Sequence, residues 1–546
     1  MVDASGAHAP AQPYPSTLTT RADHEWDSDP RLVWSRYCGF VDLSLRDFLD
    51  IQEELLLEQI DLVHSSRLGR HLLRGNNPRT VDEFRAMVPL TKYGDYLPFL
   101  GPDKDGALAE KPVVWAHTTG AQAGFKWIPY TRRGLERLLD NMMGCFILAA
   151  GSDRGDVQVW PGDTILYNAP ERPYLSGLVT FGMRERFGFR GVLEPEESER
   201  MEFKERIRKG FVEALGRRVD VIVSMTSVLV KVGEGFAEES RKTRPLRKAL
   251  KPRAVLQMGK AYLLSKLLRR QIMPRDLWPA KAIIGWGIDT PFFRDRVREY
   301  WGKPPFEIYA CTEGGIMGMQ TWKKNGLVFN PYSDFLEFIP MDESLRSRED
   351  DRYKPRTVLL NEVEAGKSYE VVITNFYGMA FIRYRVGHFV QFLPDNGSGP
   401  GAQLKQFAFL GRADDRIDMA GFTRLDEKTI WEALNASGLK FEEWTVRKEF
   451  ETDVPVLHLF IEMREQRPTE EVRTLVDQKL KEVDPFYADL QGMLGIHPLR
   501  VTLLSPGAFD RFYDVRRQAG EELGRLRPPH MNSTDADIAD LLQAGG

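Results

Sequence analysis

Short apolar runs, separated by segments with helical spacing, predict the architecture of the first part of the chain. Residues 219–224, 280–287 and 306–310 are short and largely apolar, as is typical of strands buried on both faces. Between them, residues 199–216 and 291–301 have the spacing of amphipathic helices. Helices that alternate with buried strands indicate α/β layering around a largely parallel sheet.

Capping residues and glycines predict several helix boundaries. We expect Thr80 to be the N-cap of a helix, with Glu83 completing a capping box. Thr469 is expected to cap a later helix. Gly233 and Gly235 are expected to interrupt the helix that follows the first of the buried strands.

The pattern changes in the second half of the chain. Residues 327–338, 368–375 and 381–393 alternate apolar and polar side chains, which predicts antiparallel strands. Beyond Arg412 the helix and strand patterns belong to a smaller α+β unit. We therefore expect two domains with a boundary near Asp414, preceded by a disordered N-terminal tail over residues 1–30.

Composition excludes several classes of function. The chain has 546 residues, a net charge of −4 and a pI near 6.2, so nothing predicts a nucleic-acid partner. Basic residues cluster at 241–253 and 266–270, and we interpret both clusters as solvated helix faces. No apolar run reaches the ~20 residues of a membrane helix, so no membrane partner is expected. The three cysteines lie far apart, which favours a reducing cytoplasm.

Two stretches carry candidate chemistry. In VVWAHTTGAQAGFKWIPYT (residues 113–131), hydroxyls, glycines and a lysine follow a predicted strand, and such a loop can form a nest for phosphate oxygens. By itself this loop could equally be a hydroxyl-rich turn, because it lacks the spacing of a P-loop. YACTEGG follows another predicted strand, where Glu313 could hold Mg²⁺ and Tyr309 could stack on a base.

Together these stretches resemble the adenylate-forming ligase superfamily, and most closely the auxin-responsive acyl-acid amido synthetases and their bacterial relatives. The first stretch resembles the family's Ser/Thr-Gly-rich motif, YACTEGG its Tyr-x-x-[ST]-Glu motif, and FIRYRVGHFVQF (residues 381–392) its Tyr-Arg-x-Gly-Asp motif. Further matches are FRAMVPLTKYGDYLPF, LEFIP and the interdomain stretch from Gly411 to Leu434. The resemblance extends from about residue 80 to the C-terminus.

The resemblance implies an α/β (α+β) fold. It has a large N-terminal domain of packed mixed sheets and helices, here residues 31–413, and a small mobile α+β C-terminal domain, here residues 414–546. It also implies an ATP- and Mg²⁺-dependent enzyme that converts a small carboxylic acid to an acyl-adenylate and transfers the acyl group to an amine.

By this resemblance, Lys126 and Glu313 are catalytic, Glu313 also binds the metal, and Asp414 is the hinge. Arg525 and Arg527 would replace a C-terminal catalytic lysine. The implied nucleotide-binding residues are Thr118, Thr119, Gly120, Gly124, Gly287, Tyr309, Thr312, His388 and Arg412. Aromatic residues before and after the middle strands are candidates for the acyl pocket, where apolar walls would bind an apolar acid: Trp160, Tyr174, Phe181 and Trp286.

Two alternatives remain open at this point. A ligase similar to phenylacetate–CoA ligases would perform the same first step but use CoA as its acceptor. A degenerate member would bind adenylate without ligase activity. The second alternative is motivated by Ala121 and Gln122 in the first motif, by His388 where the family has aspartate, and by the absence of lysine after Lys481.

Overall fold

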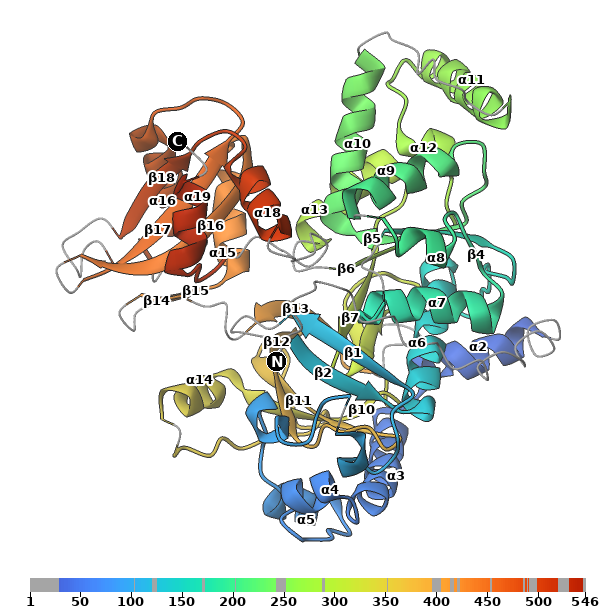
Figure 1. Cartoon of the computed structure of the whole chain (residues 1–546), viewed down its shortest axis with the longest axis vertical. Coiled ribbons are helices and arrows are strands. Elements are labelled where there is room, and N and C mark those ends of the chain that lie inside the picture. Colours follow the sequence, from blue (N-terminus) through green and yellow to red (C-terminus); the bar gives the residue numbers. More distant parts are fainter. Residues whose placement is uncertain are drawn as a thin grey trace. The chain divides into compact units, whose positions relative to one another are not determined.

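The computed structural model describes most of the chain as two compact units. The described residues are 29–102, 104–119, 125–168, 172–201, 203–241, 252–286, 290–350, 352–394, 404–412, 417–419, 423–451, 454–484, 487–488, 490, 498–518 and 530–543. The units divide between Phe409 and Leu410, and Figure 1 shows the chain coloured along its sequence.

One sheet of eleven described strands forms the centre of the large unit, in the order β10-β11-β12-β13-β9-β8-β7-β6-β5-β3-β4. Five neighbouring strands run parallel, as the buried apolar runs predicted. They are β3 (Thr164–Asn168), β4 (Arg190–Gly191), β5 (Val221–Met225), β6 (Ala282–Trp286) and β7 (Phe306–Cys311).

The other strands of this sheet are antiparallel, as the alternating pattern predicted for residues 327–338, 368–375 and 381–393; β8 and β13 were not predicted. The predicted strand over 327–338 is two strands, because Asn330–Ser333 form a turn. The strands are β8 (Gly315–Gln320), β9 (Leu327–Phe329), β10 (Asp334–Pro340), β11 (Ser368–Asn375), β12 (Tyr384–Phe392) and β13 (Phe407–Arg412); a separate hairpin consists of β1 (Val114–Thr119) and β2 (Phe125–Tyr130).

Helices cover this mixed sheet, and the fold class agrees with the α/β expectation. The most buried helix is α6 (Arg132–Ala150), which packs on β6 and β8. The other helices of the large unit are α2 (Pro30–Cys38), α3 (Leu45–Val63), α4 (Arg67–Leu72), α5 (Val81–Met87), α7 (Leu175–Phe187), α8 (Pro195–Ser198), α9 (Phe203–Ala214), α10 (Thr226–Arg241), α11 (Pro252–Leu267), α12 (Pro274–Leu277), α13 (Thr290–Trp301) and α14 (Met341–Glu349), with 3₁₀ turns at Gly39–Asp42, Tyr93–Tyr96 and Asp105–Ala107.

Local contacts explain where the boundary predictions succeeded and failed. Thr80 is the N-cap of α5, but the Glu83 carboxylate accepts from the Arg79 N–H at 2.7 Å, one residue earlier than in a capping box. Helix α10 runs through Gly233 without interruption. A Cβ at Gly233 would lie 2.3 Å from the Tyr300 ring, so this glycine lets α10 pack closely on α13.

The small unit has a three-stranded sheet in the order β16-β17-β18, flanked by helices. Thr469 is the first residue of α16, and Pro468 occupies the N-cap position, so the predicted threonine cap is wrong. The elements are β14 (Ile417–Met419), β15 (Thr423–Leu425), α15 (Glu427–Ala436), β16 (Phe441–Glu451), β17 (Val454–Met463), α16 (Thr469–Val483), β18 (Leu499–Leu504), α18 (Ala508–Gln518) and α19 (Asp535–Gln543).

A buried ion pair connects three segments of the large unit. The Arg383 guanidinium donates to both carboxylate oxygens of Glu337 at 2.9 and 2.6 Å. It also donates to the carbonyl oxygens of Arg85 and Val88 and to the Thr357 hydroxyl. Arg383 and Glu337 are 5% and 1% exposed, so the charges are compensated by these partners rather than by water.

We expect Arg383→Met to lower the free energy of unfolding by about 3–5 kcal/mol, because it leaves the Glu337 carboxylate buried and uncompensated. Urea denaturation measures the change. The matched control is Lys367→Met, which removes an exposed pair with Glu364 and should leave the free energy of unfolding nearly unchanged. Equal losses in the two variants would show that the buried pair does not stabilise the unit.

Candidate functional site

The β1–β2 hairpin brings the first motif to the site. Its register pairs Thr118 with Lys126 and Thr119 with Phe125, so Lys126 lies at the end of the hairpin nearest the loop. Thr118 and Thr119 end β1. Gly120 and Gly124, both predicted phosphate ligands, lie outside the described residues.

Lys126, Glu313 and Tyr384 meet at one point, although they come from three separate motifs. Lys126 Nζ lies 3.2 Å from Glu313 Oε1 and 3.3 Å from the Tyr384 hydroxyl oxygen. The Tyr384 hydroxyl also lies 3.2 Å from Glu313 Oε1. Burial, reinforced by the Glu313 carboxylate, raises the pKa of Tyr384 well above its usual value. Tyr384 therefore remains a neutral hydrogen-bond donor.

Aromatic contact also holds the lysine. Lys126 Nζ lies 5.2 Å from the centroid of the Tyr93 ring, within the range of a cation–π interaction. The Tyr93 hydroxyl accepts a 2.7 Å hydrogen bond from the Trp127 N–H, which fixes the ring beside the hairpin. The ammonium group thus has an aromatic face, a hydroxyl and a carboxylate around it.

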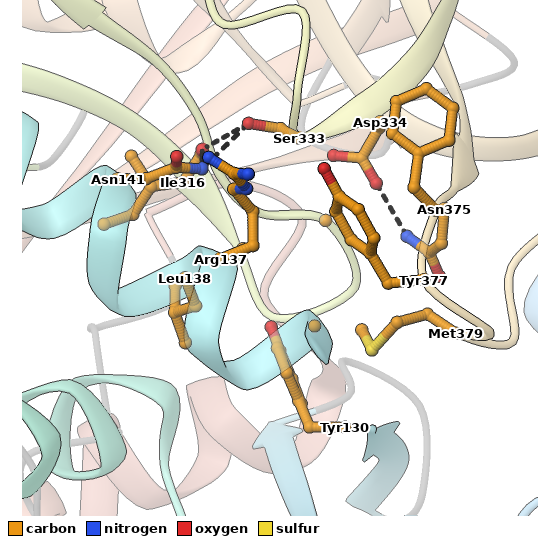
Figure 2. A pocket seen from close by; sticks show the side chains of 14 residues that line it. Tyr130, Arg137, Leu138, Asn141, Ile316, Ser333, Asp334, Asn375, Tyr377 and Met379 are labelled. Atoms are coloured by element: carbon orange, nitrogen blue, oxygen red, sulfur yellow. Dashed lines mark hydrogen bonds between the residues drawn. The ribbon is translucent and has the colours of Figure 1, made fainter. Parts of the chain in front are cut away.

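Hydrogen bonds to the backbone fix the loop that carries Glu313. The Tyr130 hydroxyl donates to the Thr312 carbonyl at 2.8 Å, and Asn375 Nδ2 donates to the Glu313 carbonyl at 3.0 Å. Asn375 Nδ2 also donates to Asp334 Oδ1 at 2.7 Å, as Figure 2 shows in the pocket behind this loop. Burial raises the pKa of the Asp334 carboxyl well above its usual value, although the Asn375 bond opposes the shift.

Tyr309 lies inside a cage of rings. Its hydroxyl is 3.2 Å from His388 Nδ1, and its ring is 3% exposed. Phe329, Phe407 and Phe409 surround it at centroid distances of 6.0, 5.5 and 5.7 Å. A nucleotide base could stack on Tyr309 only after one of these rings moved, so the predicted adenine contact now requires a rearrangement.

Of the four aromatic candidates for the acyl pocket, Trp160 and Trp286 lie at opposite edges of the sheet. Trp160 precedes the amino end of β3 and is 38% exposed. Trp286 ends β6, at the opposite edge of the same parallel sheet. Tyr174 and Phe181 both belong to α7 and its N-cap, and Arg172 covers the Phe181 ring. In a parallel sheet, a residue that precedes one strand and a residue that ends another lie at opposite edges.

The remaining predicted residues fall into two groups. Thr312 lies in the fixed loop, and Arg412 is the exposed last residue of β13. Gly287, Asp414, Arg525 and Arg527 lie outside the described residues. Three residues of the site were missed: Tyr384 and Tyr93, whose signals were their places in the FIRYRVGHFVQF and FRAMVPLTKYGDYLPF stretches, and Asn375, which gives no motif signal.

In the small unit, His530 ends the sequence loop that contains Arg525 and Arg527. Its Nδ1 lies 2.5 Å from Glu427 Oε1 and its Nε2 lies 2.8 Å from Glu443 Oε1. The imidazole stacks on Trp444 at 4.4 Å. Burial lowers the pKa of His530, but Glu443 and Glu427 outweigh burial and raise it to about 10. The side chain is an imidazolium held between two carboxylates.

Comparison with protein-family models decides the family. The chain matches models described as the GH3 family N-terminal domain at residues 39–157, the central domain at 327–406 and the C-terminal domain at 427–535. These matches occur in the order of the chain and cover more than half of it.

The chain belongs to the GH3 family.

Curated GH3 relatives are similar over part of their length. A rice jasmonoyl–L-amino acid synthetase is 24% identical over 49% of this chain and 48% of its own length. A human GH3 domain-containing protein is 28% identical over 37% of this chain and 38% of its own. The matched regions thus span about half or less of these relatives.

Solved structures support the fold. The GH3.15 acyl acid amido synthetase in complex with 2,4-DB has a TM-score of 0.64 and 17% identity, covering 95% of this chain and 97% of that one. A 2-hydroxyisobutyryl-CoA ligase in complex with 2-HIB-AMP has a TM-score of 0.58 and 15% identity, covering 99% and 97%. At this identity the similarity establishes the shared architecture.

The described part of this GH3 protein lacks two features. None of its helices has the length and apolar character needed to cross a membrane. No group of three or more His, Cys, Asp or Glu side chains there could hold a metal ion by itself. A Mg²⁺ ion at Glu313 would therefore take most of its ligands from phosphate oxygens and water.

His530 gives the small unit a predicted dependence on pH. Because its pKa is about 10 when folded and about 6.5 when unfolded, its stabilisation is complete below pH ~6.5 and is lost as pH rises to ~10. Urea unfolding of the full chain across this range, followed by tryptophan fluorescence, should show a slope that His530→Gln removes. The exposed His64→Gln serves as control. An unchanged slope in His530→Gln would contradict the assignment.

Proposed function

We propose that this GH3 protein is an ATP-dependent, AMP-forming ligase. It activates a small carboxylic acid as an acyl-adenylate and transfers the acyl group to an amine, forming an amide. The observation that carries the proposal is the meeting of Lys126, Glu313 and Tyr384, since each comes from a different motif of the adenylate-forming pattern.

The first half-reaction requires charge neutralisation more than acid–base chemistry. A carboxylate and a triphosphate repel each other, so the attack on the α-phosphate depends on cations and on in-line positioning. Lys126 supplies a cation, and the Tyr384 hydroxyl supplies a donor beside it. Bound Mg²⁺, held by Glu313 and phosphate oxygens, would neutralise further charge.

The Lys126–Glu313 ion pair suits this role. Glu313 is 7% exposed and its Oε1 lies 3.2 Å from Lys126 Nζ, so the two opposite charges compensate each other in a poorly solvated place. A phosphate bound at Lys126 would replace the Glu313 carboxylate as the partner of the ammonium group. A cation bound at Glu313 would replace the ammonium group as the partner of the carboxylate, so positive and negative charges would remain paired.

The acceptor of the acyl group distinguishes three candidate functions. Membership in the GH3 family favours an amine, because the named GH3 relatives include amino acid synthetases. CoA is the second candidate, because a CoA ligase shares the architecture. Adenylate binding without catalysis is the third, because of the departures at Ala121, Gln122 and His388.

One experiment separates these three functions. ATP–pyrophosphate exchange is measured with a panel of aryl, indolyl and fatty acids, and then product formation is measured with amino acids or with CoA. Exchange followed by amide formation supports the proposal. Thioester formation would favour the CoA ligase, and ATP binding without exchange for any acid would favour the degenerate member.

Glu313→Gln should lower pyrophosphate exchange by about 10²–10³-fold, because it removes a charge from the reacting site and no core packing. Exchange is measured at limiting Mg²⁺, with thermal unfolding to show that the fold is intact. The control is Glu299→Gln, an exposed glutamate of α13 that should leave exchange unchanged. Wild-type exchange in Glu313→Gln would overturn the metal assignment.

His388→Asp should tighten ATP binding by roughly 1.5 kcal/mol, the value of one charge-assisted hydrogen bond to a ribose hydroxyl. A carboxylate offers two acceptor oxygens where a neutral imidazole offers one acceptor nitrogen. Calorimetry measures the affinity. Because His388 also contacts Tyr309, His388→Asn is the matched control that shortens the side chain without adding charge. If both variants changed the affinity equally, the ribose role would be wrong.

A further inference from the structure

Helix α11 exposes the residues that a helix on a protein core normally buries. Leu256, Leu263 and Leu267 form one stripe at i, i+7 and i+11, and they are 76%, 70% and 78% exposed. The opposite face, which packs on the protein, carries the small residues Ala254 and Ala261 at 1% and 0% exposure. The orientation of α11 is therefore the reverse of an ordinary amphipathic helix.

Contacts on the buried face of α11 fix the rotation of the helix about its axis. The Gly216 N–H donates to the Gln257 side chain at 2.6 Å. A Cβ at Gly216 would lie 2.7 Å from the Ala254 backbone nitrogen, so the two backbones approach as closely as glycine allows. Rotating the helix to bury its leucines would break these contacts.

Positive charge flanks the leucine stripe. The exposed Lys260 and Lys266 lie on either side of it, and residues 252–275 contain six basic residues and no acidic one. In a chain of net charge −4 this is a strong local asymmetry. In Figure 1, α11 lies beyond α10 and α12, at the end of the large unit away from the β1–β2 hairpin.

We propose that α11 binds the surface of an anionic lipid bilayer. Leucines on one face with lysines beside them are the pattern of an interfacial helix, in which apolar side chains enter the headgroup region and lysines contact anionic lipids. A second copy of this chain would bring the same positive charge to the interface, which disfavours self-association through this face. Nucleic acid would match the charge but not the leucines.

This surface site is independent of the proposed ligase activity. It replaces the interpretation of residues 266–270 as merely solvated, and it adds a lipid partner that the sequence did not predict. It requires no membrane-spanning helix, because an interfacial helix lies in the plane of the bilayer.

The test uses the full chain and sedimentation with vesicles. Vesicles of phosphatidylcholine with 30% phosphatidylserine should bind the protein at least tenfold more tightly than pure phosphatidylcholine, and added salt should weaken this binding. Leu256→Gln/Leu263→Gln/Leu267→Gln should weaken binding at least tenfold. Lys260→Gln/Lys266→Gln should weaken it by about fivefold for each lysine.

Matched controls separate a specific site from general surface effects. Leu97→Gln changes a leucine that is 57% exposed elsewhere, and Lys367→Gln changes an exposed lysine elsewhere; both should bind like the wild type. Thermal unfolding should be unchanged in all variants, because the substituted side chains are exposed.

Three results would overturn the proposal. The first is a wild-type protein that binds neither vesicle, or binds both equally. The second is a wild-type dimer, seen by sedimentation velocity, that the triple leucine variant abolishes while vesicles have no effect, which would assign the face to a second copy. The third is binding to polyglutamate but not to vesicles, which would assign it to an acidic protein.

Discussion

The Arg383–Glu337 ion pair is the interaction on which the site depends. Arg383 has a φ of +44°, a left-handed backbone conformation that non-glycine residues rarely adopt. Five acceptor atoms of four residues compensate this cost, since the guanidinium reaches β10, the end of α5 and the Thr357 hydroxyl. The next residue in the chain is Tyr384. Its neighbours Arg383 and Arg385 hydrogen-bond through their backbones to Thr91, so the start of β12 is fixed on both sides.

A second buried ion pair holds β12 in the same way. The Arg385 guanidinium donates to both oxygens of Glu370, which is fully buried. Burial alone would raise the pKa of Glu370, but Arg385 outweighs burial and lowers it. Arg383, immediately before β12, and Arg385, within it, thus anchor the start of this strand to β10 and β11. Tyr384, between them, is left to contact Lys126 and Glu313.

Local pattern was sufficient for most of the strands and helices, because each depends on residues near it in the chain. Apolar runs identified the parallel strands β5, β6 and β7, and alternation identified the antiparallel strands β9 to β12. The errors arose where a distant residue decides the structure. The role of Gly233 depends on close packing against Tyr300 of another helix. The Glu83 carboxylate accepts a hydrogen bond from the Arg79 N–H instead of the Thr80 N–H that a capping box uses. Within the site, the sequence motifs identified Lys126 and Glu313, but they do not give the distance between these two side chains. Tyr93 and Asn375 act through contacts with residues 33 or more positions away.

The two units differ in how they hold charge near their predicted functional segments. In the large unit, Lys126 and Glu313 are partly accessible, and each could exchange its partner for a ligand. In the small unit, His530 is enclosed by two carboxylates and Trp444, and it has no such freedom. Removing its proton would leave Glu427 and Glu443 close together without a cation, so the imidazolium is required by its surroundings over the physiological range of pH. A charge of this kind cannot serve as a proton donor in a reaction. Its charge instead stabilises the packing of His530 between Glu427, Glu443 and Trp444.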